Sequence, residues 1–241
     1  MLLEGKTALI TGAGRGIGQA IAVAFAREGC DIAGVARTQA ELDQTAALIE
    51  EAGRRALPLA LDVTNRDAVQ EGVDEALAAF GVIDVLINNA GYALFKPFLE
   101  YTPDEWEQTL DVNLTAPFHF IQCTVPSMIE RQSGRIINIS SVAGLRPIPE
   151  QSAYCASKHG LNGLSKVLAL ELRDHGIGVH WVCPGGVDTK LSREAMPERD
   201  KTQWMTPEDI AYVCLFLAGL SPRATVDEVM IRRFGSVPLG G

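Results

Sequence analysis

Short apolar runs alternate with longer amphipathic stretches along the whole chain. Each of the first four runs is nearly continuous in Ala, Val, Ile or Leu, which is typical of strands covered on both faces. Strands separated by helices predict one α/β domain over residues 1–241, with a doubly wound, mostly parallel seven-stranded sheet flanked by helices. The strands are predicted at Thr7–Thr11, Asp31–Ala36, Ala56–Leu61, Val82–Ile87, Arg135–Ile139, Gly178–Cys183 and Glu228–Arg232.

Two helix starts are marked by the same local pattern. The segments Thr102-Pro-Asp-Glu and Thr206-Pro-Glu-Asp each place a threonine at the N-cap and a proline at the first helical position. Acidic residues follow in the first turn, where the helix dipole favours them. We therefore predict that helices begin directly after Thr102 and Thr206.

Composition excludes several classes of protein. The 241 residues include 21 Lys and Arg against 30 Asp and Glu, a formal net charge of −9. Nucleic acids and anionic membranes need a basic surface, so we expect neither as a partner. The cysteines are scattered and never in C-x-x-C spacing, which predicts reduced thiols and no metal site. We find no signal peptide and no apolar run near the roughly 18 residues that span a bilayer, so we expect a cytoplasmic protein.

A glycine-rich loop follows the first predicted strand, and a helical stretch begins at its end. The loop reads Thr11-Gly12-Ala-Gly14-Arg15-Gly16-Ile17-Gly18. Glycines let the backbone turn tightly and approach a diphosphate, and the helix N-terminus stabilises its negative charge. The loop therefore predicts a dinucleotide site whose residues include Gly12, Arg15, Gly16, Ile17 and Gly18.

The second predicted strand bears on the choice of cofactor. Asp31 lies at the start of that strand, whereas ligands bind beyond the carboxyl ends of parallel strands, so we reject it as a ribose-binding acid. The strand ends at Ala36-Arg37-Thr38, without an acid that would repel a 2′-phosphate. Guanidinium groups at Arg37 and Arg15 would form charge-assisted hydrogen bonds to such a phosphate. We predict a preference for NADP(H), with NAD(H) as the alternative if both arginines are merely solvated surface residues.

Tyr154 and Lys158 are spaced so that a helix places them on one face. Carbonyl reduction by a hydride needs a proton donor at the carbonyl oxygen. An ordinary tyrosine has a pKa near ~10, and a neighbouring ammonium group lowers it. By itself such a pair is usually a coincidence, so its meaning depends on the residues around it.

Those surroundings resemble the short-chain dehydrogenase/reductase family. The glycine pattern T-G-x-x-x-G-x-G, the segment Tyr154-Cys-Ala-Ser-Lys158 and a serine at Ser141 match the family's motifs in spacing, and the resemblance covers essentially the whole chain. It implies a Rossmann fold and a nicotinamide-dependent enzyme that interconverts a carbonyl and an alcohol. It also implies that Tyr154 is the general acid and base, and that Ser141 polarises the substrate carbonyl. Lys158 would lower the pKa of Tyr154 and bind the nicotinamide ribose, while Asn113 would hold a water that links Lys158 to solvent.

The resemblance continues at three further strand ends. Asp62-Val63 resembles the pair that contacts adenine, Asn88-Asn89-Ala90-Gly91 resembles the family's N-N-A-G segment, and Pro184-Gly185-Gly-Val187-Asp-Thr189 resembles the loop beside the nicotinamide. Beyond the glycine loop and Arg37, the cofactor contacts that the resemblance implies are Asp62, Val63, Asn89, Ala90, Gly91, Tyr154, Lys158, Pro184, Gly185, Val187 and Thr189.

Pro117 adds a local expectation at Asn113. A regular helix would bond the amide of residue 117 to the carbonyl of Asn113, and proline has no amide hydrogen. We expect a distorted helix that leaves this carbonyl free to help hold the relay water. An incidental kink is the alternative.

The substrate is expected to be a small carbonyl compound or alcohol of undetermined identity. Residues 190–206 are predicted to cover it as a lid, although a solvated loop with a few core anchors is the alternative. The nearby apolar residues suggest an apolar pocket, and the lid carries three large side chains of its own. These residues are Leu94, Phe95, Leu145 and Ile148 for the pocket, and Met196, Trp204 and Met205 for the lid.

Several functional alternatives remain at this point. A 3-oxoacyl-thioester reductase is weakened because the basic docking positions of such family members fall on Gln132 and His175, although Arg131, Arg135 and Arg173 lie nearby. A general ketone or aldehyde reductase is at least as well supported. An NAD-dependent alcohol dehydrogenase and a catalytically silent dinucleotide-binding regulator are the other readings.

The family also implies a homodimer or homotetramer. Its members usually associate through the helices that here contain Asn113 and Tyr154. The C-terminal segment Asp227-Glu-Val-Met-Ile-Arg-Arg lacks the usual Asp-Gly-Gly, which puts the family's C-terminal subunit contacts in doubt.

Overall fold

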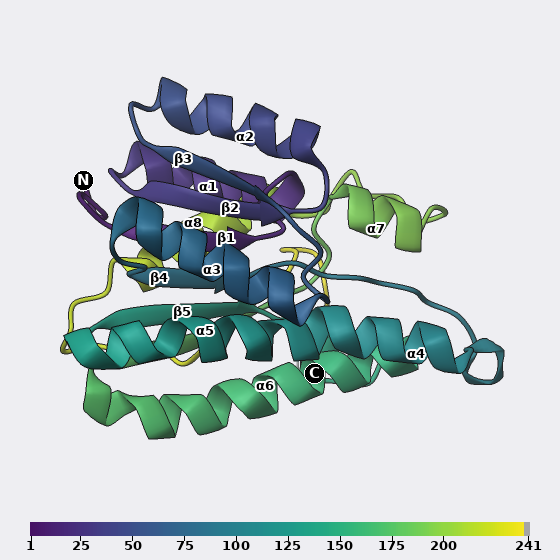
Figure 1. Cartoon of the computed structure of the whole chain (residues 1–241). Helices are drawn as coiled ribbons and strands as arrows, with labels where there is room; N and C mark the ends of the chain where they lie inside the picture. The colour runs from purple at the N-terminus through teal and green to yellow at the C-terminus, as the bar shows by residue number, and fades with distance from the viewer. Residues whose placement is uncertain (239–241) are drawn as a thin grey trace.

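Seven parallel strands form one sheet in the computed structural model, which describes residues 1–238 (Figure 1). Their order is β3-β2-β1-β4-β5-β6-β7, so the order reverses between β1 and β4, where a doubly wound sheet opens a crevice. Every strand pair is parallel, which confirms the predicted doubly wound fold. The sheet was predicted to be mostly parallel and is parallel throughout. The strands are β1 Thr7–Thr11, β2 Asp31–Ala36, β3 Ala56–Ala60, β4 Val85–Asn88, β5 Gly134–Ile139, β6 Ile177–Pro184 and β7 Glu228–Ile231.

The largest difference from the predicted strands is at β4, which begins at Val85 rather than Val82. The carboxylate of Asp84 accepts a hydrogen bond from the backbone nitrogen of Thr7 (3.0 Å) and forms ion pairs with Lys6 and Arg131. Asp84 therefore fixes the start of the strand. The apolar residues before it belong to the connecting segment, although Ile83 is fully buried.

Helices cover both faces of the sheet in two layers. Helices α1, α2 and α8 pack on one face, and α3, α5 and α6 pack on the other (Figure 1). Each face of the sheet has its own apolar core, and the side chains of β1 alternate between them. Ala8 and Ile10 lie in the core under α1, α2 and α8, and Leu9 lies in the core under α3, α5 and α6. The helices are α1 Gly16–Arg27, α2 Gln39–Glu51, α3 Arg66–Phe80, α4 Pro103–Leu110, α5 Ala116–Arg131, α6 Ser152–Leu172, α7 Lys190–Ala195 and α8 Pro207–Ala218.

Both predicted helix starts are confirmed. Thr102 and Glu105 form a capping box at α4, and Thr206 and Asp209 form one at α8. Each helix has a proline in its first turn. The threonine side chain and the acidic side chain together satisfy amide groups that the helix itself leaves unpaired.

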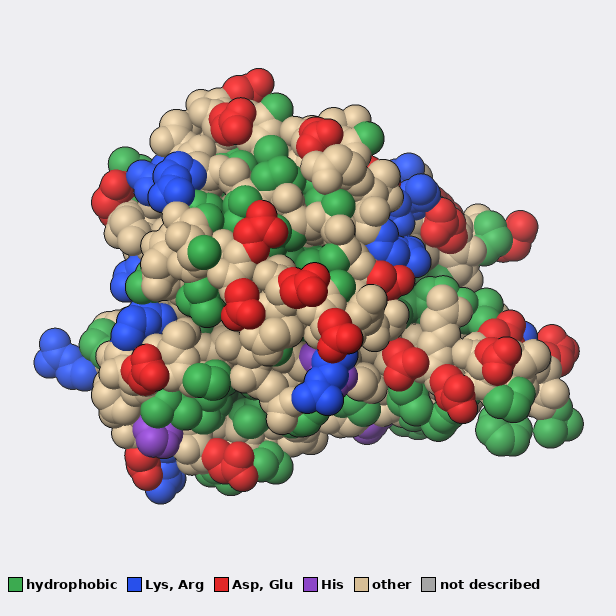
Figure 2. Space-filling model, viewed as in Figure 1, with side chains coloured by type: hydrophobic (Ala, Val, Ile, Leu, Met, Phe, Trp, Pro, Cys, Tyr) green, Lys and Arg blue, Asp and Glu red, His purple; other side chains and the backbone are tan. Residues whose placement is uncertain are grey.

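Charge is spread unevenly over the surface. Figure 2 shows acidic side chains scattered over the face that carries α2 and α3, while one group of basic side chains lies at the edge between α2 and α7. Among residues 1–238, no helix combines the length and the apolar character needed to cross a bilayer.

Candidate active site

A cavity of about 970 Å³ opens at the carboxyl ends of the strands. Its walls include the segments that follow all seven strands, where ligands of doubly wound sheets bind. Gly18 and Asn113 are the two predicted site residues outside its lining. The predicted residues that line it are Gly12, Arg15, Gly16, Ile17, Arg37, Asp62, Val63, Asn89, Ala90, Gly91, Ser141, Tyr154, Lys158, Pro184, Gly185, Val187 and Thr189.

The glycine loop forms a cradle at the start of α1. Gly12 and Gly16 adopt φ angles of 66° and 57°, a left-handed conformation that favours glycine. A Cβ atom on Gly18 would lie 2.1 Å from the carbonyl oxygen of Gly12, so this glycine lets the helix approach the loop without lining the cavity. The N-cap residue Arg15 makes no side-chain hydrogen bond to α1, and the first turn holds no acid. The amide groups at this helix start are therefore available to a diphosphate, and the loop fits a dinucleotide.

Thr11 joins the loop to the end of β4. Its hydroxyl oxygen accepts hydrogen bonds from the backbone nitrogens of Asn89 (2.9 Å) and Ala90 (3.0 Å). The Asn89 side-chain nitrogen in turn donates to the Thr11 carbonyl oxygen (2.9 Å). The N-N-A-G segment and the glycine loop are thus held as one unit. Thr11 is the threonine of the T-G-x-x-x-G-x-G pattern, but the sequence did not indicate its role, because the hydrogen bonds join it to residues 78 and 79 positions away.

The end of the cavity beside β2 and β3 contains Asp62; because the sequence predicts the adenosine contacts there, we call it the adenosine end. Its carboxylate accepts from the backbone nitrogen (2.9 Å) and the hydroxyl (2.8 Å) of Thr64, and the backbone hydrogen bond is the main reason that its pKa lies below the usual range. Asp31 lies at the start of β2, outside the cavity lining, and forms an ion pair with Arg54 (2.8 Å). The rejection of Asp31 as a ribose-binding acid agrees with this placement.

Arg15 and Arg37 both line this end, but in different states. Nη1 of Arg15 lies 2.7 Å from a carboxylate oxygen of Glu41, which also lines the cavity. The Thr45 hydroxyl lies within hydrogen-bond distance of the backbone carbonyl oxygens of Ala13 (3.0 Å) and Glu41 (3.2 Å), so it joins α2 to the glycine loop. Arg37 is exposed and has no carboxylate within ion-pair distance among residues 1–238. Glu41 is a site residue that sequence analysis missed.

Tyr154 and Lys158 lie on α6 and face the same cavity. Burial raises the pKa of Tyr154 to about 12, and a hydrogen bond with the Ser141 side chain opposes that rise. Burial lowers the pKa of Lys158 to about 8. Nζ of Lys158 donates to the carbonyl oxygen of Ile139 (2.9 Å) and lies 5.7 Å from the centroid of the Tyr154 ring. Burial and Ser141 set the pKa of Tyr154 in this structure, so its lowering by Lys158 stays a prediction.

Ser141 is presented by the end of β5. It is the extended residue before the short 3₁₀ helix Val142–Gly144, and its hydroxyl accepts from the backbone nitrogen of Ala143 (3.1 Å). Ser140 is buried, and its hydroxyl is directed to the carbonyl oxygen of Lys158 (3.5 Å). The two serines therefore have different environments, with Ser141 beside Tyr154.

Asn113 lies in a π-helical turn, Asp111–Thr115, between α4 and α5. The backbone nitrogen of Ala116 bonds to the carbonyl oxygen of Asp111, five residues back, which confirms the helix distortion expected before Pro117. The Asn113 side chain is fully buried and bonds to the backbone of Tyr92 and to the Ser157 hydroxyl (3.1 Å). Its polar atoms are thus occupied, so any relay water is left to the backbone carbonyl of Asn113.

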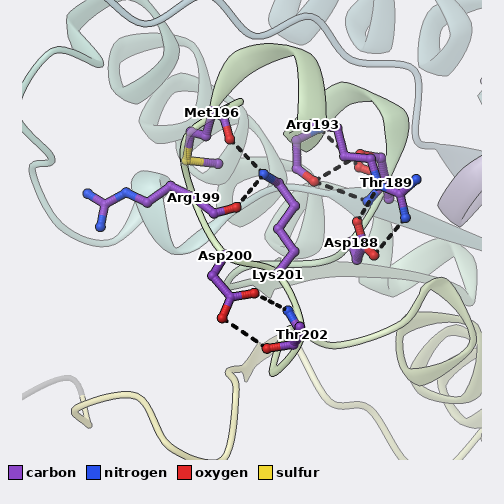
Figure 3. A network of polar contacts seen from close by, with 9 residues as sticks. Asp188, Thr189, Arg193, Met196, Arg199, Asp200, Lys201 and Thr202 are labelled. Carbon is purple, nitrogen blue, oxygen red and sulfur yellow. Dashed lines mark hydrogen bonds and ion pairs between the residues drawn. The ribbon is translucent and has the colours of Figure 1, made fainter.

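The predicted lid contains α7, and hydrogen bonds among its own and flanking residues hold its shape (Figure 3). Arg193 binds both carboxylate oxygens of Asp188 (2.8 Å each), and Lys201 donates to the carbonyl oxygens of Met196 (2.6 Å) and Arg199 (2.9 Å). A bridge between Val187 and Met205 joins the ends of the segment. Met205 is a buried anchor, while Met196 and Trp204 line the cavity. The movement of this lid stays a prediction.

The substrate side of the cavity is partly apolar. Phe95 and Ile148 line it, and the Phe95 ring packs edge-on against Tyr154 with centroids 5.5 Å apart. Leu94 and Leu145, which the sequence also suggested, are outside the lining. The C-terminal segment was not predicted here, yet Arg232, Arg233, Ser236 and Val237 all contribute to the wall.

Comparison with known proteins agrees with this geometry. Residues 6–200 match the family described as short chain dehydrogenase. The chain is 37% identical to a 3-oxoacyl-(acyl-carrier-protein) reductase FabG of Thermotoga maritima, over 90% of this chain and 92% of that protein. It is 38% identical to a metagenomic short-chain oxidoreductase in complex with NADP, with a TM-score of 0.86 over 96% of this chain and 99% of that one.

A third relative extends the comparison to alcohol oxidation. An alcohol dehydrogenase of Thermococcus sibiricus, complexed with 5-hydroxy-NADP, is 31% identical, with a TM-score of 0.90 over 97% of this chain and 99% of that one. The family match covers most of the sheet and both parts of the Tyr154–Lys158 pair. The chain therefore belongs to the short-chain dehydrogenase/reductase family and is an oxidoreductase that acts on alcohol and carbonyl groups.

Proposed function

We propose that this enzyme uses NADP(H) to interconvert a carbonyl and an alcohol, with Tyr154 as the general acid and base. The supporting observation is that Tyr154, Ser141 and Lys158 line the same cavity as the glycine cradle. A dinucleotide held by that cradle would extend along the strand ends towards Tyr154. When bound, NADPH supplies the hydride.

The residues of the site divide the remaining work. Ser141 binds and polarises the carbonyl oxygen, and Tyr154 donates its phenolic proton to that oxygen in reduction. The ammonium group of Lys158 stabilises the phenolate that remains, because an opposite charge nearby favours the ionised form. In oxidation the same groups act in reverse, and Tyr154 accepts the alcohol proton. The π-helical turn at Asn113 would hold the water through which Lys158 exchanges protons with solvent.

The preference for NADP(H) rests on Arg37 and Arg15 at the adenosine end. Arg37 is free to pair with a 2′-phosphate, which supports the proposal. The ion pair of Arg15 with Glu41 favours the alternative, NAD(H), because it neutralises one of the two guanidinium groups. Solved relatives include both kinds, since a carveol dehydrogenase of Mycobacterium avium is in complex with NAD. Equal or higher kcat/KM with NADH than with NADPH would contradict our preference.

The chemical proposal is tested by Tyr154→Phe. We expect kcat for NADPH-dependent ketone reduction to fall by about 10²- to 10⁴-fold, the range of general acid catalysis. The NADPH dissociation constant should change by less than about twofold, since the substitution removes a hydroxyl and leaves the ring. Tyr212→Phe, at an exposed tyrosine of α8, is the matched control. A wild-type chain that binds NADPH but reduces no member of a broad ketone panel would instead support the silent-regulator reading.

We favour small ketones and aldehydes over a carrier-bound thioester as substrates. Gln132 contacts His175 (3.4 Å), Arg131 pairs with Asp84, and Arg135 donates to backbone carbonyl groups. Arg131 and Arg135 are thus engaged within the fold, and the exposed Arg173 pairs with the adjacent Asp174 (3.3 Å). A higher kcat/KM for a 3-oxoacyl carrier-protein thioester than for all free ketones would reverse this preference.

We also propose a homodimer or homotetramer in the cytoplasm. Figure 1 shows α5 and α6 side by side at one edge of the fold, and Phe118, Val167 and Leu170 of these helices are exposed apolar residues. Burying such side chains at a subunit interface is favourable. The free state of all five cysteines suits a reducing compartment. Sedimentation analysis would reveal a monomer if the assembly proposal is wrong.

A further inference from the structure

Several arginines line the cavity without an acidic partner. They come from three segments: the loop after β5, the lid, and the chain after β7. None has a carboxylate within ion-pair distance among residues 1–238. These four are Arg146, Arg199, Arg232 and Arg233; at the adenosine end of the same cavity Arg37 is also unpaired, whereas Arg15 pairs with Glu41.

The arginines after β7 lie beside the loop that follows β6. The backbone nitrogen of Gly185 donates to the carbonyl oxygen of Ile231 (2.8 Å), and a Cβ on Gly185 would lie 3.5 Å from Cα of Arg232. Ser141 follows β5, two strands away, and neighbouring strands are about 4.8 Å apart. A substrate whose carbonyl contacts Ser141 would therefore reach this segment about 10 Å away.

Arg233 is held by an aromatic contact, and among residues 1–238 its side chain donates no hydrogen bond and forms no ion pair. Its guanidinium carbon lies 5.3 Å from the centroid of the Trp204 ring, and that ring packs so closely on Gly186 that a Cβ there would come within 2.9 Å of it. Nη1 of Arg232 donates to the carbonyl oxygens of Arg233, Phe234 and Ser236, which shapes the segment. Arg232 thus builds the wall, and Arg233 offers its donors to the cavity.

The lid adds a second free guanidinium. Figure 3 shows the Arg199 side chain extending away from the hydrogen bonds that close the lid, while its carbonyl oxygen accepts from Lys201. Arg199 has an acid on each side in the sequence: Glu198 forms no ion pair with it, and Asp200 is occupied by the backbone nitrogen (2.9 Å) and hydroxyl (3.0 Å) of Thr202. The positive charge of Arg199 is therefore not neutralised within the lid.

Acidic residues also line the cavity. Glu41 and Asp62 lie at its adenosine end, Asp200 lies on the lid with its carboxylate bonded to Thr202, and three more lie on the wall formed by α4 and the turn after it. Asp104 and Glu107 lie on α4, and Asp111 begins the π-helical turn; all three are exposed. They would repel an anion at that wall and leave the segment after β7 as the favourable place for one. The apolar side chains of Phe95 and Ile148 supply the surface for the carbon chain between the two ends of a substrate.

We propose that the substrate is an anionic ketone or alcohol whose carboxylate or phosphate binds Arg233, with Arg199 as a second contact from the lid. This inference rests on the proposed oxidoreductase function and names the substrate class for it. A guanidinium fork binds either anion through two parallel hydrogen bonds, and such charge-assisted bonds are about twice as strong as neutral ones. The arrangement selects a substrate with the carbonyl at one end and the anion at the other.

Matched substrate pairs test the proposal with the full chain and NADPH. Levulinate is compared with methyl levulinate, and hydroxyacetone phosphate with hydroxyacetone, so that the two arms distinguish a carboxylate from a phosphate. In at least one pair we expect kcat/KM to be about 10- to 100-fold higher for the anion, the range of a charge-assisted contact. The proposal would be overturned if kcat/KM for the anionic and the neutral compound agreed within twofold in both pairs, or if kcat/KM were higher for the neutral compounds.

Variants locate the effect on Arg233. Arg233→Gln should reduce the ratio of anionic to neutral kcat/KM by about 10-fold or more, and Arg233→Lys should restore part of it. Arg223→Gln, at an exposed arginine outside the cavity, makes the same change in net charge and should leave the ratio unchanged. If Arg233→Gln instead weakened NADPH binding tenfold at an unchanged ratio, the arginine would serve the cofactor and the proposal would be wrong.

A binding measurement separates this inference from the proposed function. Calorimetric titration of the NADP⁺-saturated chain with levulinate and with its methyl ester requires no turnover. Binding of the acid alone, lost in Arg233→Gln, would support the anion site even if no ketone were reduced, in which case only the proposed activity would fail. Equal binding of acid and ester, or equal binding by wild type and Arg233→Gln, would overturn the anion site even in an active enzyme.

Discussion

The side-chain nitrogen of Lys158 donates to the carbonyl oxygen of Ile139 at 2.9 Å, deep in the floor of the cavity. One peptide dipole offsets only part of the cost of burying an ammonium group, and burial lowers the pKa of Lys158 to about 8. The last residue of β5 thus points its carbonyl at the lysine of α6. A strand end and a helix face share the task of holding the charge near Tyr154.

Substitution of Lys158 by Met should change the pH dependence of stability. The native-state pKa of Lys158 is about 8, below its ordinary 10.5, so between these values the unfolded chain binds the extra proton and wild-type stability rises with pH. The free energy of unfolding of Lys158→Met minus that of wild type should be largest below pH 8. It should fall by on the order of 2 kcal/mol as the pH approaches about 10. Urea unfolding without cofactor would measure it, and a difference independent of pH would contradict the assigned burial cost.

Substitution of Glu41 by Gln should shift the enzyme towards NADP(H). The change frees Arg15 from its ion pair and removes a carboxylate from the adenosine end of the cavity. Because the pair is partly exposed, we expect the ratio of kcat/KM for NADPH to that for NADH to rise only about two- to fivefold. Glu51→Gln, at the other end of α2, is the control. A lower ratio would show that Glu41 positions Arg15 for the phosphate.

The sequence predicts the parts of this site whose signals are local. Strands β1 and β2 have their predicted bounds because buried apolar runs end there at polar or glycine-rich segments. The roles of Glu41 and Arg233 depend on contacts with residues distant in the chain, such as Arg15 and Trp204. The residues next to Glu41 or Arg233 in the sequence do not indicate which distant residues they contact.

The same limit explains the two predicted residues outside the cavity lining. Gly18 belongs to the glycine motif, but its effect is the close approach of α1 to Gly12. Asn113 was expected to hold a relay water with the help of its backbone carbonyl, which Pro117 leaves without an amide partner. Its side chain is bonded to Tyr92 and to Ser157, 44 residues away in the second case, and only the tertiary fold shows that these partners occupy it.

Pro117→Ala should impair proton exchange at Asn113. The variant supplies an amide that can bond to the Asn113 carbonyl and favours a regular helix over the π-helical turn. We expect kcat to fall about tenfold and the pH–rate profile to shift, since the relay is one part of general acid catalysis. Pro126→Ala, in the same α5 but further along it, should leave both unchanged. An unaltered profile in Pro117→Ala would mean that the distortion is incidental.

Gly18→Ala should weaken NADPH binding, whereas Gly163→Ala should leave it unchanged. A Cβ at Gly18 would meet the carbonyl oxygen of Gly12 at 2.1 Å and the Asn89 side chain at 2.5 Å, so Gly18→Ala must push α1 away from the glycine loop. We expect NADPH to bind at least about tenfold more weakly, because the amide groups and the dipole at the start of α1 would move away from the diphosphate. Fluorescence titration with NADPH measures this.

Gly163 provides the matched control inside α6. A Cβ there would meet no atom of the same chain within 4 Å outside its own helix turn, and Gly163 lies away from the cavity, so Gly163→Ala should bind NADPH normally. Urea unfolding of both variants distinguishes a general loss of stability from a local one. If Gly18→Ala bound NADPH as tightly as wild type, the close contact of α1 with the loop would not be what shapes the diphosphate site.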